Sequence, residues 1–171
     1  MYNLQKNNYH QKPKASNIQT PLAVSEFIFE LLKDKISIQK GKPILDPCCG
    51  QGNLLRPWIK TGYPAYGIEI EEDNKDDPVV LIQDFLTWDG IDVFQYKVKP
   101  QLILCNPPFN GYKGKCSAEI WLDKIIELFG KNIPIVLFTS MGFRLNGKKN
   151  GQRWSKFTND KYPPIISIIS L

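Results

Sequence analysis

Short apolar runs alternate with amphipathic stretches along most of this chain of 171 residues. Six runs have the length of strands, and we expect strands at 43–46, 65–70, 79–82, 101–105, 133–139 and 165–169. Helical spacing of apolar residues predicts a helix that begins at Pro21 and ends near 33–35, a second helix over 120–129 and another over 54–60. Because the runs are continuous rather than alternating, the pattern indicates an α/β protein with a mostly parallel sheet covered by helices on both faces.

The two ends of the chain differ from this pattern. Residues 1–17 are polar, and we expect a flexible N-terminal arm there, followed by one domain over 18–171. The stretch 142–161 is polar and rich in Gly and Asn, which predicts a long loop. Since the chain stops within or just after the sixth run, we expect one or more C-terminal strands of such a sheet to be missing.

The composition indicates an ordinary globular protein of the cytoplasm. It is 42% hydrophobic and 23% charged, with no run long enough to span a membrane and no signal peptide. The four cysteines, Cys48, Cys49, Cys105 and Cys116, are spaced unlike a disulfide framework, so we expect reduced thiols. With one histidine, His10, and no paired C-x-x-C, we expect no metal site.

The net charge of +5 is unevenly distributed along the chain. The middle of the chain is acidic, whereas 142–161 carries six basic residues against the single acid Asp160. The basic residues are Arg144, Lys148, Lys149, Arg153, Lys156 and Lys161. A solvated loop and a contact with phosphate both explain such a segment, and the sequence leaves the two open.

The run at 101–105 ends in Asn106, Pro107, Pro108 and Phe109. Proline has no N–H to donate and its φ is fixed, so the two prolines end the strand and hold its tip rigidly. The tip carries an amide, backbone carbonyls and a flat ring, a set that suits gripping the exocyclic amine of a planar base. The quartet resembles the catalytic motif of the amino-methyltransferases, above all the adenine-N6 DNA methyltransferases.

A glycine-containing turn follows the strand at 43–46. It contains Asp46, Cys48, Gly50 and Gly52, and it matches neither the dinucleotide fingerprint nor a P-loop. Glycines allow the backbone to approach a ligand closely, and an acid at the strand end favours an ammonium group over a phosphate. The turn resembles the S-adenosylmethionine loop of class I methyltransferases; the alternative is a plain turn between a strand and a helix.

The resemblance implies roles for further residues. Glu69, at the end of the second strand, is implied as the acceptor for the ribose hydroxyls of the cofactor. Asp84 is implied as the acceptor for its adenine amine, and Phe85 as the cover of its adenine ring. Thr20 and Pro21 match the motif that contacts the methionine end, although the same pair reads equally well as a helix cap with proline at the first helical position.

The order of these motifs resembles the gamma arrangement of adenine methylases, over about residues 19–140. The resemblance implies a Rossmann-like class I fold and methyl transfer from S-adenosylmethionine to the N6 amine of a flipped-out adenine in DNA, as in restriction-modification. It also implies that Asn106 and the Pro107 carbonyl accept the amine hydrogens while Phe109 stacks on the base.

Several alternatives for the function remain open at this stage. The chain has no evident target recognition domain: either it is a truncated or minimal methylase, or a partner subunit supplies recognition, or the product is defective. An RNA adenine or a protein glutamine is an alternative substrate for the same motifs. Besides methylation of DNA and methylation of RNA or protein, a third possibility is that the chain is a non-catalytic remnant that binds the cofactor or nucleic acid.

Overall fold

The computed structural model describes residues 19–71, 80–90, 99–108, 117–140, 143 and 151–170. The predicted N-terminal arm, 1–17, and Phe109 lie outside these ranges.

A five-stranded parallel sheet forms the centre of the molecule, with the strand order β3-β2-β1-β4-β5. The strands are β1 (Ile44–Asp46), β2 (Ala65–Glu69), β3 (Val80–Ile82), β4 (Leu102–Cys105) and β5 (Ile135–Leu137). Along the chain, β2 and then β3 are added on one side of β1, and β4 and then β5 are added on its other side. The direction therefore reverses between β1 and β4, which is where open α/β sheets bind ligands at the carboxyl ends of their strands.

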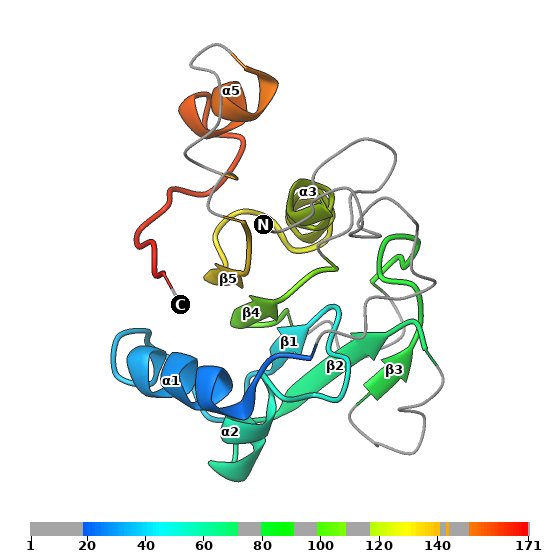
Figure 1. Cartoon of the computed structure of the whole chain (residues 1–171), viewed down its shortest axis with the longest axis vertical. Coiled ribbons are helices and arrows are strands. Elements are labelled where there is room, and N and C mark those ends of the chain that lie inside the picture. The colour runs from blue at the N-terminus through cyan, green and yellow to red at the C-terminus, as the bar shows by residue number, and fades with distance from the viewer. Residues whose placement is uncertain are drawn as a thin grey trace, which may run out of the picture.

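Helices cover both faces of the sheet, as the sequence predicts (Figure 1). The helices α1 (Leu22–Leu32) and α2 (Arg56–Lys60) lie on one face, where Ile28 and Trp58 pack against Ile44 and Leu104. Helix α3 (Ser117–Phe129) lies on the other face, where its Ile125 joins a second buried cluster. The central strands β1 and β4 are buried along their whole length, which explains their unbroken apolar sequence.

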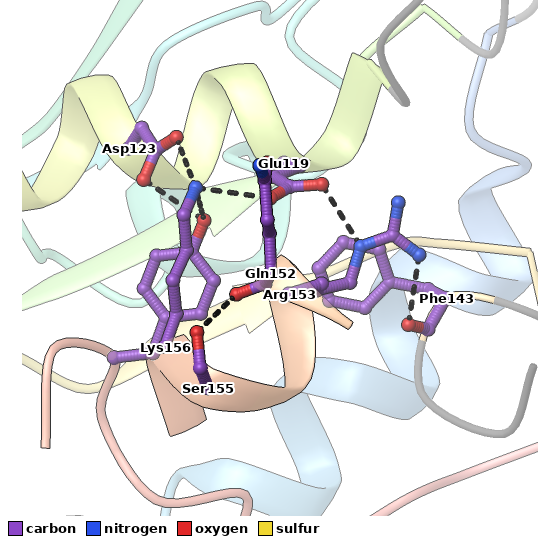
Figure 2. A network of polar contacts seen from close by, with 8 residues as sticks. Glu119, Asp123, Phe143, Gln152, Arg153, Ser155 and Lys156 are labelled. Atoms are coloured by element: carbon purple, nitrogen blue, oxygen red, sulfur yellow. Dashed lines mark hydrogen bonds and ion pairs between the residues drawn. The ribbon is translucent and has the colours of Figure 1, made fainter. Parts of the chain in front are cut away.

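The predicted loop at 142–161 is wrong in its second half, because residues Gln152–Thr158 form helix α5. Lys156 Nζ contacts Glu119 Oε1 at 2.9 Å and Asp123 Oδ2 at 2.7 Å, both on α3 (Figure 2). Arg153 Nε binds the other oxygen of Glu119 at 2.9 Å, and the hydroxyl of Tyr162 donates to Asp123 Oδ1 at 2.8 Å. These two basic residues are therefore partners of α3 rather than charges of a solvated loop.

The predicted sixth strand at 165–169 is also wrong: the described segment 163–170 contains no strand. Four isoleucines of this segment are exposed, and Ile166 keeps 94% of its surface accessible. An apolar run forms a strand only when a neighbouring strand satisfies its backbone groups, and among the described residues β5 pairs with β4 alone.

Candidate active site

The carboxyl ends of three neighbouring strands meet at one edge of the sheet. Asp46 ends β1, Glu69 ends β2 and Asn106 directly follows β4. The parallel pairing of β1 with both β2 and β4 brings these ends together. The chemistry-bearing residues therefore gather at the point where the strand order reverses.

The turn after β1 is held in a conformation that requires glycine at Gly50. Its φ is +52°, and a Cβ at this position would lie 2.3 Å from Oε1 of Gln19. The same oxygen of Gln19 accepts a 2.9 Å hydrogen bond from the backbone N–H of Gln51. The segment before α1 thus lies directly over the glycine turn.

A second close approach, at Gly67 in β2, escaped the sequence analysis. A Cβ on Gly67 would lie 2.4 Å from Sγ of Cys49, so the turn after β1 packs against the backbone of β2. The N–H of Cys49 donates a 3.0 Å hydrogen bond to the carbonyl of Ile68. A glycine inside a strand is a recognised mark of close backbone approach, and this signal was present in the sequence.

Backbone N–H groups from the turn and from the end of β2 fix the carboxylate of Glu69. Its Oε2 accepts a 2.7 Å hydrogen bond from Gly50, and its Oε1 accepts from Ile70 at 2.8 Å and from Glu71 at 3.3 Å. Each carboxylate oxygen has two lone pairs, so Oε2 keeps the capacity to accept one more hydrogen bond. Glu69 is therefore an acceptor held in one place beside the glycine turn.

The carboxyl of Asp46 lies beneath the turn and is only 2% exposed. Burial raises the pKa of Asp46 to about 7, a 3.1 Å hydrogen bond from the N–H of Cys48 opposes that rise, and the negative charge of Glu69 adds to it. A positive group bound at this edge would shift the Asp46 pKa back down. The pKa of Asp46 therefore depends on the charge of any group that binds above the turn.

Two thiols join the turn to β4. Sγ of Cys48 and Sγ of Cys105 are 3.7 Å apart, and burial raises the pKa of both thiols. A neutral thiol is a poor nucleophile, so neither is expected to react; the contact of Cys48 with the cofactor that the resemblance implies stays a prediction.

The side chain of Asn106 has one partner and one unused group. Its Nδ2 donates a 2.9 Å hydrogen bond to the hydroxyl oxygen of Thr20. Its Oδ1 is buried, and no hydrogen-bond partner for it exists among the described residues. The following Pro107 is buried and Pro108 is partly buried, which keeps the tip of β4 stiff. A buried acceptor without a partner costs free energy, so this atom is a candidate for contact with a ligand.

The structure corrects the helix-cap reading of Thr20 and Pro21 and leaves their contact with the cofactor a prediction. Helix α1 begins at Leu22 with Pro21 as its N-cap residue, and no side chain caps it. The prediction that Thr20 is the N-cap and Pro21 the first helical residue is therefore wrong by one position. The Thr20 hydroxyl instead meets Asn106, and the carbonyl of Thr20 accepts a 2.8 Å hydrogen bond from Nδ2 of Asn53. The roles of Gln19 and Asn53 in this arrangement were not predicted.

Asp84 and Phe85, which follow Gln83 after the end of β3, have contacts of their own. Asp84 Oδ1 accepts a 2.9 Å hydrogen bond from the N–H of Leu86, which makes a local turn. Phe85 is 1% exposed and stacks on Trp121 of α3, with ring centroids 5.2 Å apart and planes 6° from parallel. Phe85 is thus part of the core as the structure stands, and its predicted contact with an adenine ring stays a prediction, as does that of Asp84.

Two other features, a metal site and a membrane-spanning helix, are absent from the described residues. These residues contain no group of three His, Cys, Asp or Glu residues that could hold a metal ion. None of their helices has the length and apolar character that crossing a bilayer demands.

The comparisons with known proteins define the class of fold. A putative class I S-adenosylmethionine-dependent methyltransferase from Listeria monocytogenes superposes with a TM-score of 0.50 at 16% identity, covering 74% of this chain and 48% of that chain. The chain therefore has the class I methyltransferase fold, as the order of its motifs predicts. A TehB-like methyltransferase from Corynebacterium glutamicum is more distant, with a TM-score of 0.42 at 18% identity over 67% of this chain and 72% of that one.

The sequence itself is similar to one curated protein, a type I restriction enzyme MjaVII methylase subunit from Methanocaldococcus jannaschii. The two are 25% identical over 199 aligned positions, which cover 91% of this chain and 34% of that protein. The chain thus spans about a third of the length of its relative, and the likeness agrees with the resemblance to DNA methylases. No family model matches the chain.

Proposed function

We propose that this chain is the catalytic domain of an S-adenosylmethionine-dependent methyltransferase that acts on the N6 amine of adenine in DNA. The observation that carries the proposal is the amide of Asn106. Its Oδ1 is buried without a partner in the described part of the chain, at the same edge of the sheet as the glycine turn and the fixed carboxylate of Glu69. An acceptor in such a position suits a substrate N–H group.

The residues at the sheet edge fit the cofactor. Glu69 has a free acceptor position for a ribose hydroxyl, and Gly50 and Gly52, both with positive φ, allow close approach of the backbone. Asp46 places a negative charge under the turn, which suits an ammonium group. The sulfonium of the cofactor supplies an activated methyl group. Asp84, Phe85, Thr20 and Pro21 stay in the proposed binding set on the strength of the family resemblance.

The chain's own residues then act on the amine of the base. Oδ1 of Asn106 accepts a hydrogen bond from one N–H of the amine, and the carbonyl of Pro107 accepts a hydrogen bond from the other. These two hydrogen bonds draw the nitrogen lone pair out of conjugation and orient it, which is catalysis by position and electrostatics. Phe109 is proposed to stack on the base, which leaves the duplex by flipping.

The relative supports DNA as the substrate, because it is a methylase subunit of a restriction enzyme. It is about three times as long as the part matched here, so we propose that target recognition comes from further chain or from a partner subunit. A cytoplasmic location is part of the proposal. The thiols of Cys48 and Cys105, which form no disulfide in the described part of the chain, support it, because such thiols persist in reducing compartments.

The test is incubation of the full chain with labelled S-adenosylmethionine and unmethylated genomic DNA, followed by nucleoside analysis for N6-methyladenine. We expect N6-methyladenine with the native chain and none with Asn106→Ala, which keeps cofactor binding. Label in RNA or in protein glutamine instead would identify one of the alternative substrates. Cofactor binding without transfer to DNA, RNA or protein would overturn the proposal and favour a non-catalytic remnant.

A further inference from the structure

We propose that Thr20 is the positioning residue for Asn106: its hydroxyl oxygen holds the amide nitrogen, so that the amide oxygen faces the substrate. This inference rests on the proposed function. Nδ2 of Asn106 lies 2.9 Å from Oγ1 of Thr20, although the two residues are 86 positions apart in sequence. The hydrogen bond occupies one end of the amide and leaves Oδ1 at the other.

The orientation of this amide decides what the site does. An asparagine amide turned by about 180° exchanges its donor and acceptor ends with almost no change of shape. With Oδ1 toward the substrate, the amide accepts a hydrogen bond from an amine. With Nδ2 toward the substrate, it would set N–H groups against N–H groups and repel the same amine. A hydroxyl can bind either end of an amide, so Thr20 fixes the place of the group. In the structure the hydroxyl oxygen accepts from Nδ2 of Asn106, which leaves Oδ1 as the end that meets the substrate.

Thr20 is itself held firmly on both sides. Its carbonyl accepts a 2.8 Å hydrogen bond from Nδ2 of Asn53, and Pro21, which follows it, caps the first turn of α1 by accepting hydrogen bonds from Val24 and Ser25. Thr20 is 8% exposed, and a β-branched side chain has few rotamers available. The hydroxyl is thus fixed by the backbone around it and does not depend on Asn106 for its place.

The same segment contacts the glycine turn. Oε1 of Gln19 accepts from the N–H of Gln51, and the Gln19 side chain occupies the space that a Cβ on Gly50 would need. Residues Gln19 and Thr20 therefore connect the proposed cofactor turn to the proposed catalytic amide. Because α1 takes no side-chain cap from Thr20, helix capping does not account for its hydroxyl.

The experiment compares Thr20→Val, which has nearly the same shape without the hydroxyl, with Thr20→Ser, which restores it. Thr158→Val is the matched control, because the Thr158 hydroxyl bonds only within α5, to the carbonyls of Trp154 and Ser155. Three kinds of quantity are measured on the full chain: the kinetic constants kcat and KM for DNA methylation, the Kd for S-adenosylmethionine, and the side-chain amide resonances of Asn106 by NMR.

We expect Thr20→Val to lower kcat by roughly 10- to 100-fold, the size of effect that misplacing a catalytic group produces. KM for DNA should stay within about twofold of the native value, since the change leaves ground-state binding of DNA in place. The Kd for the cofactor shows separately how much of the effect comes from the proposed contact of Thr20 with the methionine end of the cofactor. The Asn106 amide resonances should move in Thr20→Val and return toward their native positions in Thr20→Ser. Thr158→Val should change none of the three quantities.

Two results would overturn the inference. Native kcat in Thr20→Val, or Asn106 resonances that do not move, would show that the hydroxyl does not orient the amide. A large rise in the cofactor Kd with unchanged kcat at saturation would make Thr20 a cofactor ligand instead. The amide resonances need no turnover, so an inactive native chain would contradict the proposed function while the NMR comparison still tests the role of Thr20.

Discussion

The backbone N–H of Gly50 donates a 2.7 Å hydrogen bond to Oε2 of Glu69, joining the turn after β1 to the end of β2. Because Oε1 of Glu69 accepts two further N–H groups, the carboxylate is satisfied only as a carboxylate. An amide in its place would set an N–H group against a backbone N–H whichever way it turned.

Glu69→Gln should therefore weaken binding of S-adenosylmethionine by roughly 10- to 100-fold, the effect of leaving a buried donor unpaired. Isothermal titration calorimetry measures this directly. Glu71→Gln is the matched control, since the proposed site uses only the backbone N–H of Glu71. If Glu69→Gln bound the cofactor as the native chain does, Glu69 would have no part in the site.

Gly50→Ala should lose cofactor binding for a steric reason. Both Gly50→Ala and Gly62→Ala force alanine into a positive φ, which costs about 1–2 kcal/mol of folding stability. Gly62 has open space around it, whereas a Cβ on Gly50 meets the side chain of Gln19. Urea denaturation should show similar losses of stability, while calorimetry should show lost binding only for Gly50→Ala. Adding Gln19→Ala removes the clash and should recover part of the binding; no recovery would mean that backbone strain alone is responsible.

Asp46 should make the protein less stable as the pH rises. Its folded pKa of about 7 lies above the ordinary 3.8, so the folded state binds the extra proton between these two values. Stability therefore falls as the pH rises through this window, by at most roughly 4 kcal/mol, and levels off above it. Urea denaturation across this pH range should show that Asp46→Asn removes this part of the slope. An unchanged slope in the variant would contradict the raised pKa.

A related prediction concerns ligand binding near neutral pH. A bound ammonium group favours the charged form of Asp46, so binding of S-adenosylmethionine should release protons between about pH 6 and 7. Calorimetry in buffers of different ionisation enthalpy measures this release. Asp46→Asn should abolish it, and proton release that persists in the variant would assign it to another group.

Lys156 should contribute to stability through its contacts with α3. Lys156→Met leaves Glu119 and Asp123 without one of their cationic partners, and we expect a loss of about 1–3 kcal/mol in urea denaturation. Lys33→Met is the control, since Lys33 pairs with the exposed Glu30 and should change stability by less than about 1 kcal/mol. Equal losses in the two variants would mean that the contacts of α5 are worth no more than a surface pair.

The same network gives the opposite pH dependence from Asp46. Partial burial of Glu119 opposes its ionisation, but hydrogen bonds from Lys156 and Arg153 outweigh this and lower its pKa. The stabilisation is therefore present above the ordinary carboxyl pKa and is lost as the pH falls through the lowered folded value. Lys156→Met should shrink this acid-side loss, which the same denaturation series measures.

The sequence predicts the sheet well because β1 and β4 are buried on both faces, and this burial leaves a continuous apolar run that periodicity detects. It does not predict α5, because Arg153 and Lys156 find their acids on α3, far away in sequence. The strand predicted at 165–169 is wrong for a related reason, because an apolar run in the sequence does not specify a neighbouring strand for it to pair with.

At the proposed site, a short-range pattern marks some of the residues, whereas others are defined by a tertiary contact that the sequence does not show. The glycine turn and the Asn-Pro-Pro tip are visible in the sequence. Whether Thr20 caps a helix or meets Asn106 depends on where β4 lies relative to α1, which no local pattern encodes. The stacking of Phe85 on Trp121 likewise depends on a tertiary contact, and the predicted contact of Phe85 with an adenine ring stays a prediction.

The contact between Thr20 and Asn106 also has a consequence for how the chain folds. It closes a loop of 86 residues and joins the segment before α1 to the fourth strand, so it can exist only after β1 has paired with β4. A partly folded chain that retains its helices and its separate strands would lack this contact. The Asn106 amide resonances are for that reason a reporter of complete folding, and the same spectrum can distinguish a misfolded preparation from a folded but inactive one.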